Sequence, residues 1–89
     1  MLLDGDARRD VLRRLHRAEG QLHGIIGVVE SGRDCADIVT QLAAVVRALD
    51  SAGFTIIAAG LRQGAAAPAS DVDTAESMAR LEKLFLSLA

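Results

Sequence analysis

The chain contains a single cysteine, Cys35, whose thiol can form an adduct with an electrophile, be oxidised or bind a soft metal ion. Asp34 is a natural helix N-cap, which places Cys35 in the first turn of a helix, where the N-terminal dipole favours the thiolate. Arg33 favours the thiolate as well, whereas Asp34 and Asp37 oppose it. The alternative is a buried small hydrophobic residue, because free cysteine is among the most buried residue types.

Basic residues gather in one short segment near the start of the chain. Half of the ten lysine and arginine residues lie there, with Asp10 as the only acid among them: Arg8, Arg9, Arg13, Arg14 and Arg17. Four side chains lie within a turn or two of one another on the exposed side of a predicted helix: Arg13, Arg14, Arg17 and Gln21. They are placed to meet phosphates or base edges of DNA. The formal net charge of −2 argues against a uniformly basic nucleic-acid binder, and a solvated charged face is the alternative.

Three further polar residues share one face of the same helix. His16, Glu19 and His23 are spaced by three and four, which is compatible with a zinc-type or nickel-type site. The simpler interpretation is a solvated polar flank that contains an ion pair.

The composition favours helices as the elements that position these side chains. Of the 89 residues, 51% are hydrophobic but only 2% are aromatic, and neither Trp nor Tyr occurs. Aliphatic side chains of this kind favour packed helices over a sheet. The expected fold is therefore all-α, with residues 1–89 as a single domain. A domain of this size is only marginally stable alone, so self-association is expected.

The first helix is predicted over residues 6–30, with Asp4 or Asp6 as its cap. Its apolar residues recur at spacings of four and three, which is typical of a seam for an antiparallel partner. They are Val11, Leu15, Ala18, Leu22, Ile25 and Val29. Gly32 follows the helix and accepts the left-handed conformation that a helix end often needs.

The second helix is predicted from Cys35 to about Gln63 and is the longest apolar segment of the chain. Apolar residues cover most of its circumference, so one partner helix cannot bury it, and it is either central or shared between subunits. Gly53 and Gly60 each cost such a helix about 1 kcal/mol relative to alanine, and Gly53 is a candidate break.

A linker over residues 64–70 precedes a third helix, because Pro68 stops helix propagation. Asp71 or Asp73 caps this helix, and its apolar stripe consists of Met78, Leu81, Phe85 and Leu88. The expected subunit is a long antiparallel helical hairpin with a short C-terminal helix, assembled as a dimer or as a dimer of dimers.

The expected location is the cytoplasm. The chain has no charged start followed by an apolar signal region, and a single cysteine excludes an intramolecular disulfide framework. The apolar second helix invites a membrane interpretation, but Arg47 and Asp50 lie within it and would be costly in hydrocarbon.

Two segments carry a family resemblance: RRLHRAEGQLHGI at residues 13–25 and DCADIVTQLAAVVRAL at residues 34–49. They resemble the CsoR/RcnR family of bacterial transcriptional repressors, which is also described as FrmR-like. Nearly the whole chain is covered. The resemblance implies a three-helix subunit, an antiparallel helical dimer and commonly a flat tetramer. It also implies binding to operator DNA that weakens when an effector is sensed.

The resemblance assigns roles to particular residues. DNA contacts are implied for Arg14, Arg17 and Gln21, with Arg13 on the same face and Arg47 joining from the second helix. Effector sensing is implied for Cys35.

The metal-ligand set that the resemblance implies is incomplete in this chain. Metal-sensing members carry a histidine, and then a histidine or cysteine, at the positions of Gly60 and Gly64, so Cys35 is the one ligand left. The persulfide-sensing branch needs a second cysteine near Gly60. The formaldehyde-sensing branch usually has proline where this chain has Leu2.

The sequence thus predicts a DNA-binding repressor, and not an enzyme, that leaves its operator when an effector acts at or near Cys35. The effector is an electrophile or aldehyde, another thiol-reactive species, or a metal. A first alternative is a copper-type sensor that uses Cys35 with ligands from another subunit, so a copper ion stays open as a cofactor. A second is a helical assembly partner that does not bind DNA. The expected partners are double-stranded operator DNA and further copies of the chain, with no membrane.

Overall fold

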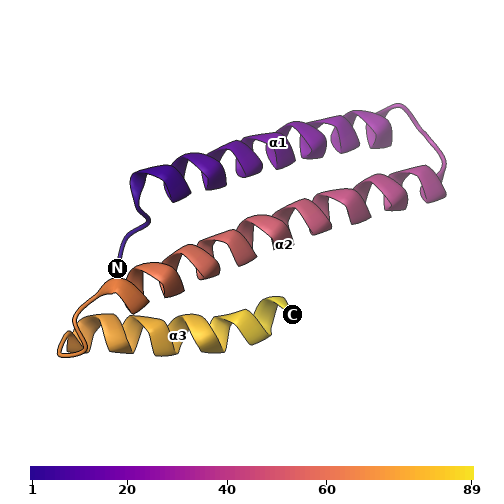
Figure 1. Ribbon diagram of the computed structural model, residues 1–89. Helices are drawn as coiled ribbons and strands as arrows, with labels where there is room; N and C mark the ends of the chain where they lie inside the picture. Colours follow the sequence, from indigo (N-terminus) through magenta and orange to yellow (C-terminus); the bar gives the residue numbers. More distant parts are fainter.

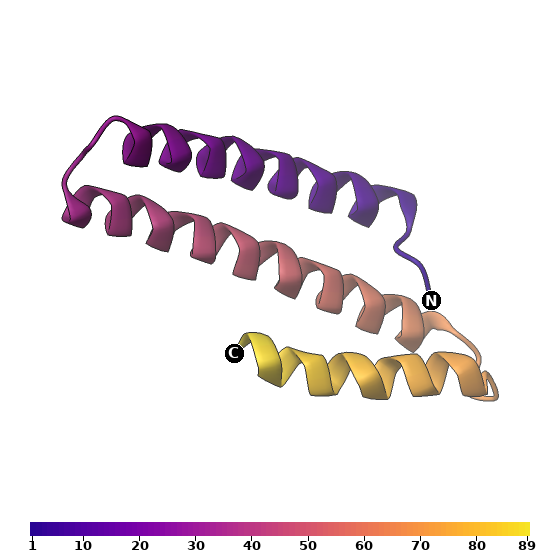
Figure 2. The same ribbon diagram turned by 180° about the vertical axis from the view of Figure 1, so that it is seen from behind.

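The computed structural model describes residues 1–89 and contains three α-helices and no strands. They are α1 (Gly5–Glu30), α2 (Cys35–Ala66) and α3 (Val72–Leu88). α1 and α2 form a long antiparallel hairpin, and α3 folds back along the C-terminal half of α2 (Figure 1). Viewed from behind, α2 again lies between the other two helices (Figure 2), and α1 and α3 do not contact each other. The all-α three-helix prediction is confirmed.

Each helix begins at an aspartate cap. The carboxylate of Asp4 accepts the backbone N–H of Ala7 at 2.8 Å, and the carboxylate of Asp34 accepts that of Ala36 at 3.0 Å. Asp71 caps α3 in the same way. These contacts satisfy N–H groups that have no partner within the helix. Between α1 and α2 the chain turns at Gly32, whose φ of 74° lies in the left-handed region, as predicted.

The second helix is longer than predicted. α2 continues to Ala66, so the linker before α3 is shorter than residues 64–70, and no break occurs at Gly53. The reason is packing of α3, since the side chains of its stripe lie against the glycines of α2. Leu88 lies against Gly53, Leu81 against Gly60 and Met78 against Gly64. This close approach of two helices compensates for the cost of glycine within a helix.

Only part of the predicted seam of α1 is buried. The buried positions recur every seven residues: Val11, Ala18 and Ile25. The intervening positions are exposed: Leu15, Leu22 and Val29. Seven residues correspond to about two helical turns, so α1 touches α2 along one narrow line. The other half of the seam lies on the surface of the single subunit.

The subunit is a single layer of helices. Its dimensions are 57 × 25 × 13 Å, and the smallest is close to the diameter of one helix, about 10–12 Å. Its radius of gyration is 16.9 Å, whereas a compact domain of this length has about 12 Å. Its accessible surface of 6444 Å² also exceeds the value of about 5000 Å² for a compact monomer of 9.4 kDa. A layer one helix thick has no interior of its own.

α2 is long enough and apolar enough to span a membrane by length and composition alone. It is packed along its length by α1 and along its C-terminal half by α3 (Figures 1 and 2), and Arg47 and Asp50 lie near its centre. Buried helices of proteins outside membranes meet the same length and composition criteria, so this observation is weak evidence for a membrane.

Candidate functional site

The basic segment of α1 forms an exposed face, with one exception. Arg13, Arg17 and Gln21 are exposed, as predicted. Arg14 is half-buried instead. Its Nε donates to the Asp10 carboxylate at 3.2 Å, and its Nη1 donates to Ser51 Oγ on α2 at 2.7 Å. Arg14 therefore links the two helices as well as adding positive charge.

Asp10 holds two of the arginines in place. Its Oδ1 accepts from Arg13 Nη2 at 2.9 Å and from Arg14 Nε. The hydrogen bond from Arg13, together with the hydrogen bond and positive charge of Arg14, keeps the pKa of Asp10 below its usual value. The carboxylate is therefore ionised at neutral pH, and Arg17 remains without an ion pair.

The structure brings Arg47 of α2 next to this face. Arg47 and Arg14 line one shallow hollow between α1 and α2, together with Asp50 and Ser51. The sequence assigned no role at the site to Asp50 or Ser51, two polar residues of this hollow. Ser51 is 37 residues from Arg14, so only the pairing of α1 with α2 could reveal the contact.

Cys35 lies in the first turn of α2, directly after its cap, as predicted. It is a free thiol and is exposed, so the buried interpretation is wrong for the single subunit. The nearest ion pair joins Arg33 Nε to Asp37 Oδ2 at 3.9 Å, which draws this guanidinium toward a carboxylate. Cys35 lies at the end of the hairpin far from α3 (Figure 1).

The residues tested for metal binding do not assemble a site within one subunit. No three His, Cys, Asp or Glu side chains come together to hold a metal ion. In the trio on α1, His16 Nδ1 lies 3.3 Å from Glu19 Oε1 at the exposed surface, and His23 does not complete a site. Within one subunit the trio therefore presents one contact, between His16 and Glu19, at the exposed surface.

Gly60 and Gly64 are both buried and face α3. A Cβ added at Gly60 would lie 2.5 Å from Leu81 Cδ1, and one at Gly64 would overlap the Met78 side chain. Side chains of α3 therefore cover the two positions of α2 at which the resemblance implies metal ligands.

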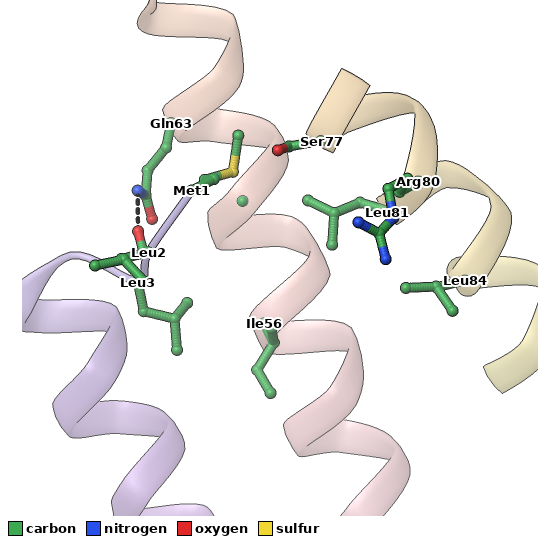
Figure 3. Close-up of a pocket in the computed structure, with 10 residues that line it drawn as sticks. Met1, Leu2, Leu3, Ile56, Gln63, Ser77, Arg80, Leu81 and Leu84 are labelled. Atoms are coloured by element: carbon green, nitrogen blue, oxygen red, sulfur yellow. Dashed lines mark hydrogen bonds between the residues drawn. The ribbon is translucent and has the colours of Figure 1, made fainter. Parts of the chain in front are cut away.

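A second hollow lies at the opposite end of the hairpin from Cys35. It is bounded by residues 1–3, the C-terminal half of α2 and α3, and its walls are mainly apolar (Figure 3). No pattern in the sequence indicated this hollow, because its residues come from three separate segments.

Comparison with known proteins identifies the family. Residues 7–87 match the family described as metal-sensitive transcriptional repressor. The chain is 32% identical over 81 residues to the copper-sensing transcriptional repressor RicR of Mycobacterium tuberculosis H37Rv, with 84% of each chain covered. It is 45% identical over 52 residues to the copper-sensing transcriptional repressor CsoR of Mycobacterium ulcerans, covering 58% of this chain and 44% of that relative.

The similarity to CsoR of Bacillus subtilis is 38% over 47 residues, or 53% of this chain and 46% of that relative. No solved structure matches the chain significantly. The family match spans nearly the whole sequence, and the three helices agree with the resemblance seen in residues 13–25 and 34–49. The chain belongs to the family of metal-sensitive transcriptional repressors.

Proposed function

We propose that the protein is a cytoplasmic transcriptional repressor that binds double-stranded operator DNA through α1 and the adjoining part of α2. The observation that carries this proposal is the exposed basic face in a chain of a repressor family. Arg13, Arg17 and Gln21 project from α1, and Arg14 and Arg47 border the same hollow. Arginines placed in this way contact phosphates and base edges. The family consists of repressors, and no enzymatic activity is part of the proposal.

The repressor acts as a homo-oligomer, either a dimer or a tetramer. A row of large aliphatic side chains on α2 is exposed in the single subunit: Val39, Leu42, Val46 and Leu49. Their spacing of three and four residues makes one continuous stripe along the helix. A second copy of the chain offers the matching stripe, and its burial would supply the apolar interior that one layer of helices lacks.

Effector sensing is assigned to Cys35, because it is the exposed thiol of the chain and lies at a helix N-terminus. The named relatives sense copper, which favours a metal over an electrophile or aldehyde as the effector class. Cu(I) prefers thiolate and thioether ligands, and Cys35 supplies only one thiolate.

Within one subunit the residues do not fit a copper site, since Gly60 and Gly64 have no side chains and α3 covers them. Copper sensing is therefore a second candidate that requires ligands from another subunit in addition to Cys35.

Release from DNA would follow from a change in how α1 packs on α2. The hydrogen bond from Arg14 Nη1 to Ser51 Oγ ties the basic face to α2, the helix that begins at Cys35. A change at Cys35 that shifts one helix along the other would move Arg14 and Arg17 out of register with the phosphates. Such coupling needs two arrangements of the helices with different DNA affinity.

The experiment is a titration of the reduced protein against the DNA upstream of its own gene, over a series of salt concentrations. Specific binding that weakens steeply with salt is expected, because each phosphate contact releases counterions. Repeating the titration with Cu(I), formaldehyde, persulfide and peroxide identifies the effector as the agent that abolishes binding. If the protein binds this DNA no more tightly than unrelated DNA, the repressor assignment fails, and the chain is instead a helical assembly partner.

A further inference from the structure

A pocket of about 290 Å³ lies between the N-terminal segment, α2 and α3, at the end of the hairpin opposite Cys35 (Figure 3). Its walls are mainly aliphatic, with Leu3 from the N-terminal segment, Ile56 from α2 and Leu84 from α3. Pockets that bind small molecules are mostly apolar and begin at about 300 Å³. The size and lining are therefore those of a site for a small ligand.

The pocket exists because position 60 is a glycine. Gly60 lines it, and a Cβ added there would lie 2.5 Å from Leu81 Cδ1 and 3.4 Å from Met1 Sδ. A larger residue at position 60 would displace the end of the Leu81 side chain or fill part of the pocket. The same glycine that lacks a metal-ligating side chain thus shapes an apolar pocket.

The N-terminal wall is fixed by a side-chain clamp. Gln63 Nε2 donates to the carbonyl oxygen of Leu2 at 2.6 Å (Figure 3). Gln63 Oε1 accepts the backbone N–H of Asp4 at 3.2 Å. The amide of Gln63 is therefore occupied on both sides and holds the N-terminal segment against α2.

Two polar side chains of the pocket are free for a ligand. The guanidinium of Arg80 points from α3 toward the space beside α2 (Figure 3) and forms no ion pair. Ser77, one turn earlier on the same helix, also lines the pocket, and its hydroxyl group makes no hydrogen bond to the protein. No carboxylate lines the pocket, and its one charged side chain, Arg80, is a cation.

We propose that this pocket binds a small organic carboxylate with an apolar body. The apolar part lies against Leu3, Ile56 and Leu84, and the carboxylate pairs with Arg80 and accepts from the Ser77 hydroxyl group. The volume equals that of roughly ten waters in the liquid, which corresponds to a molecule of about ten non-hydrogen atoms. A cation is disfavoured by Arg80, and a metal ion finds no carboxylate, imidazole or thiolate there.

Within one subunit the pocket lies at the opposite end of the hairpin from Cys35, and a ligand bound there goes beyond the sensing role assigned to that residue. The clamped segment leads directly into Asp4, the cap of α1, so a ligand in the pocket contacts the segment that precedes this helix. An effect of the ligand on DNA affinity rests on the proposed function, whereas binding itself does not.

The test is calorimetric titration of the full chain, without DNA, with octanoate, which has ten non-hydrogen atoms, and with octylammonium as the cation of the same chain length. Octanoate is expected to bind more tightly than octylammonium. Arg80→Gln should weaken octanoate binding by roughly threefold to fivefold, the effect of a partly exposed ion pair, and leave octylammonium binding unchanged or stronger. Lys83→Gln, on the same helix but outside the pocket, should leave octanoate binding unaltered.

A second pair of variants tests the location. Ser77→Leu should fill the pocket and abolish octanoate binding, whereas Ser87→Leu, at an exposed position near the end of α3, should retain it. Amide chemical shifts should move at residues 2–3, 56–63 and 77–84. Equal affinity for octanoate and octylammonium, or shifts confined to the exposed stripe of α2, would overturn the proposal. DNA titrations with and without saturating octanoate are evaluated separately from the calorimetry. If the protein fails to bind operator DNA without octanoate, this result contradicts only the repressor assignment and not the pocket.

Discussion

Gly60 and Gly64 connect the missing metal ligands with the packing of α3. The family resemblance implies metal-ligating side chains at these positions, whereas here Leu81 and Met78 lie directly against the glycine backbone. The loss of two ligands and the docking of α3 are therefore consequences of the same two residues. Cys35, at the other end of α2, keeps its exposed thiol and is the residue on which sensing is proposed to depend.

The contact between Gly64 and Met78 can be tested by measuring the free energy of unfolding of a substituted protein. Gly64→Ala is expected to destabilise the protein by about 1–3 kcal/mol, because the new methyl group overlaps the Met78 side chain. Gly24→Ala is the matched control, since nothing lies within 4 Å of a Cβ at that helical position and alanine should stabilise α1 by up to about 1 kcal/mol. Urea unfolding at one fixed protein concentration measures both. Equal effects of the two substitutions would contradict the packing of α3 on Gly64.

Replacement of Cys35 separates DNA binding from sensing. Cys35→Ala should bind operator DNA with the affinity of the wild type, because Cys35 begins α2 whereas Arg14 meets that helix at Ser51, and it should no longer respond to the effector. The DNA titration with and without Cu(I) or another inducer measures both properties. A variant that still responds would place the sensing residue elsewhere.

The Asp71 cap predicts a pH dependence of stability. The backbone N–H and the side chain of Thr74 donate to its carboxylate, which lowers the pKa of Asp71 from its usual value of about 3.9. A lowered folded-state pKa contributes stability above the unfolded value, and this contribution is lost as the pH falls through the folded value.

The melting temperature of the wild type should therefore fall more between about pH 6 and about pH 2.5 than that of Asp71→Asn, which caps without titrating. Asp73→Asn, inside the first turn, should behave more like the wild type. If Asp71→Asn showed the full acid sensitivity of the wild type, the charge on this cap would have no role in stability.

Two helices share the proposed DNA interface, and their pairing determines its shape. α1 contributes Arg13, Arg17 and Gln21, while Arg14 reaches across to Ser51 and lies beside Arg47 of α2. Most of the buried residues of α1 lie along a single line that faces α2. The Arg14 to Ser51 hydrogen bond is the side-chain hydrogen bond between α1 and α2. A shift of one helix along the other would break it.

Arg17→Ala should weaken operator binding and reduce the salt dependence by about one phosphate, a change of about 0.9 in the slope of log K against log salt. Arg17 is exposed and unpaired, so the fold should not change. Arg62→Ala, an exposed arginine near the far end of α2, is the control and should leave the slope unaltered. A normal slope for Arg17→Ala would place the DNA interface on another face.

The whole subunit is a flat layer, and this shape supports the proposed assembly into an oligomer. With a thickness of 13 Å, it leaves the stripe formed by Val39, Leu42, Val46 and Leu49 in water. Large apolar side chains are exposed on both long helices. Such exposed apolar surface is typical of a subunit that packs against another copy in an oligomer.

Val46→Glu tests this interface. A carboxylate in the middle of the stripe should convert the oligomer into monomers, because burial of an unpaired charge costs several kcal/mol. Sedimentation velocity measures the change, with Ala79→Glu on the exposed side of α3 as the control. A Val46→Glu protein that sediments like the wild type would exclude this stripe as the contact between copies.

The helices themselves follow from local sequence. Aspartate caps, Gly32 and the spacing of apolar residues act over a few positions, so the start of each helix, the hairpin turn and the first turn at Cys35 were predictable from the chain alone. The basic face of α1 was predictable for the same reason, because residues three and four apart share a helical face.

Contacts between helices were decided by the tertiary structure. The continuation of α2 to Ala66, the absence of a break at Gly53 and the occupation of Gly60 and Gly64 all depend on α3, which is distant in sequence. The same holds for the Arg14 to Ser51 contact and for the pocket clamped by Gln63. The local spacing of apolar residues predicts which side of a helix is apolar. It does not predict which helix packs there, how closely the two helices approach, or what space a glycine leaves between them.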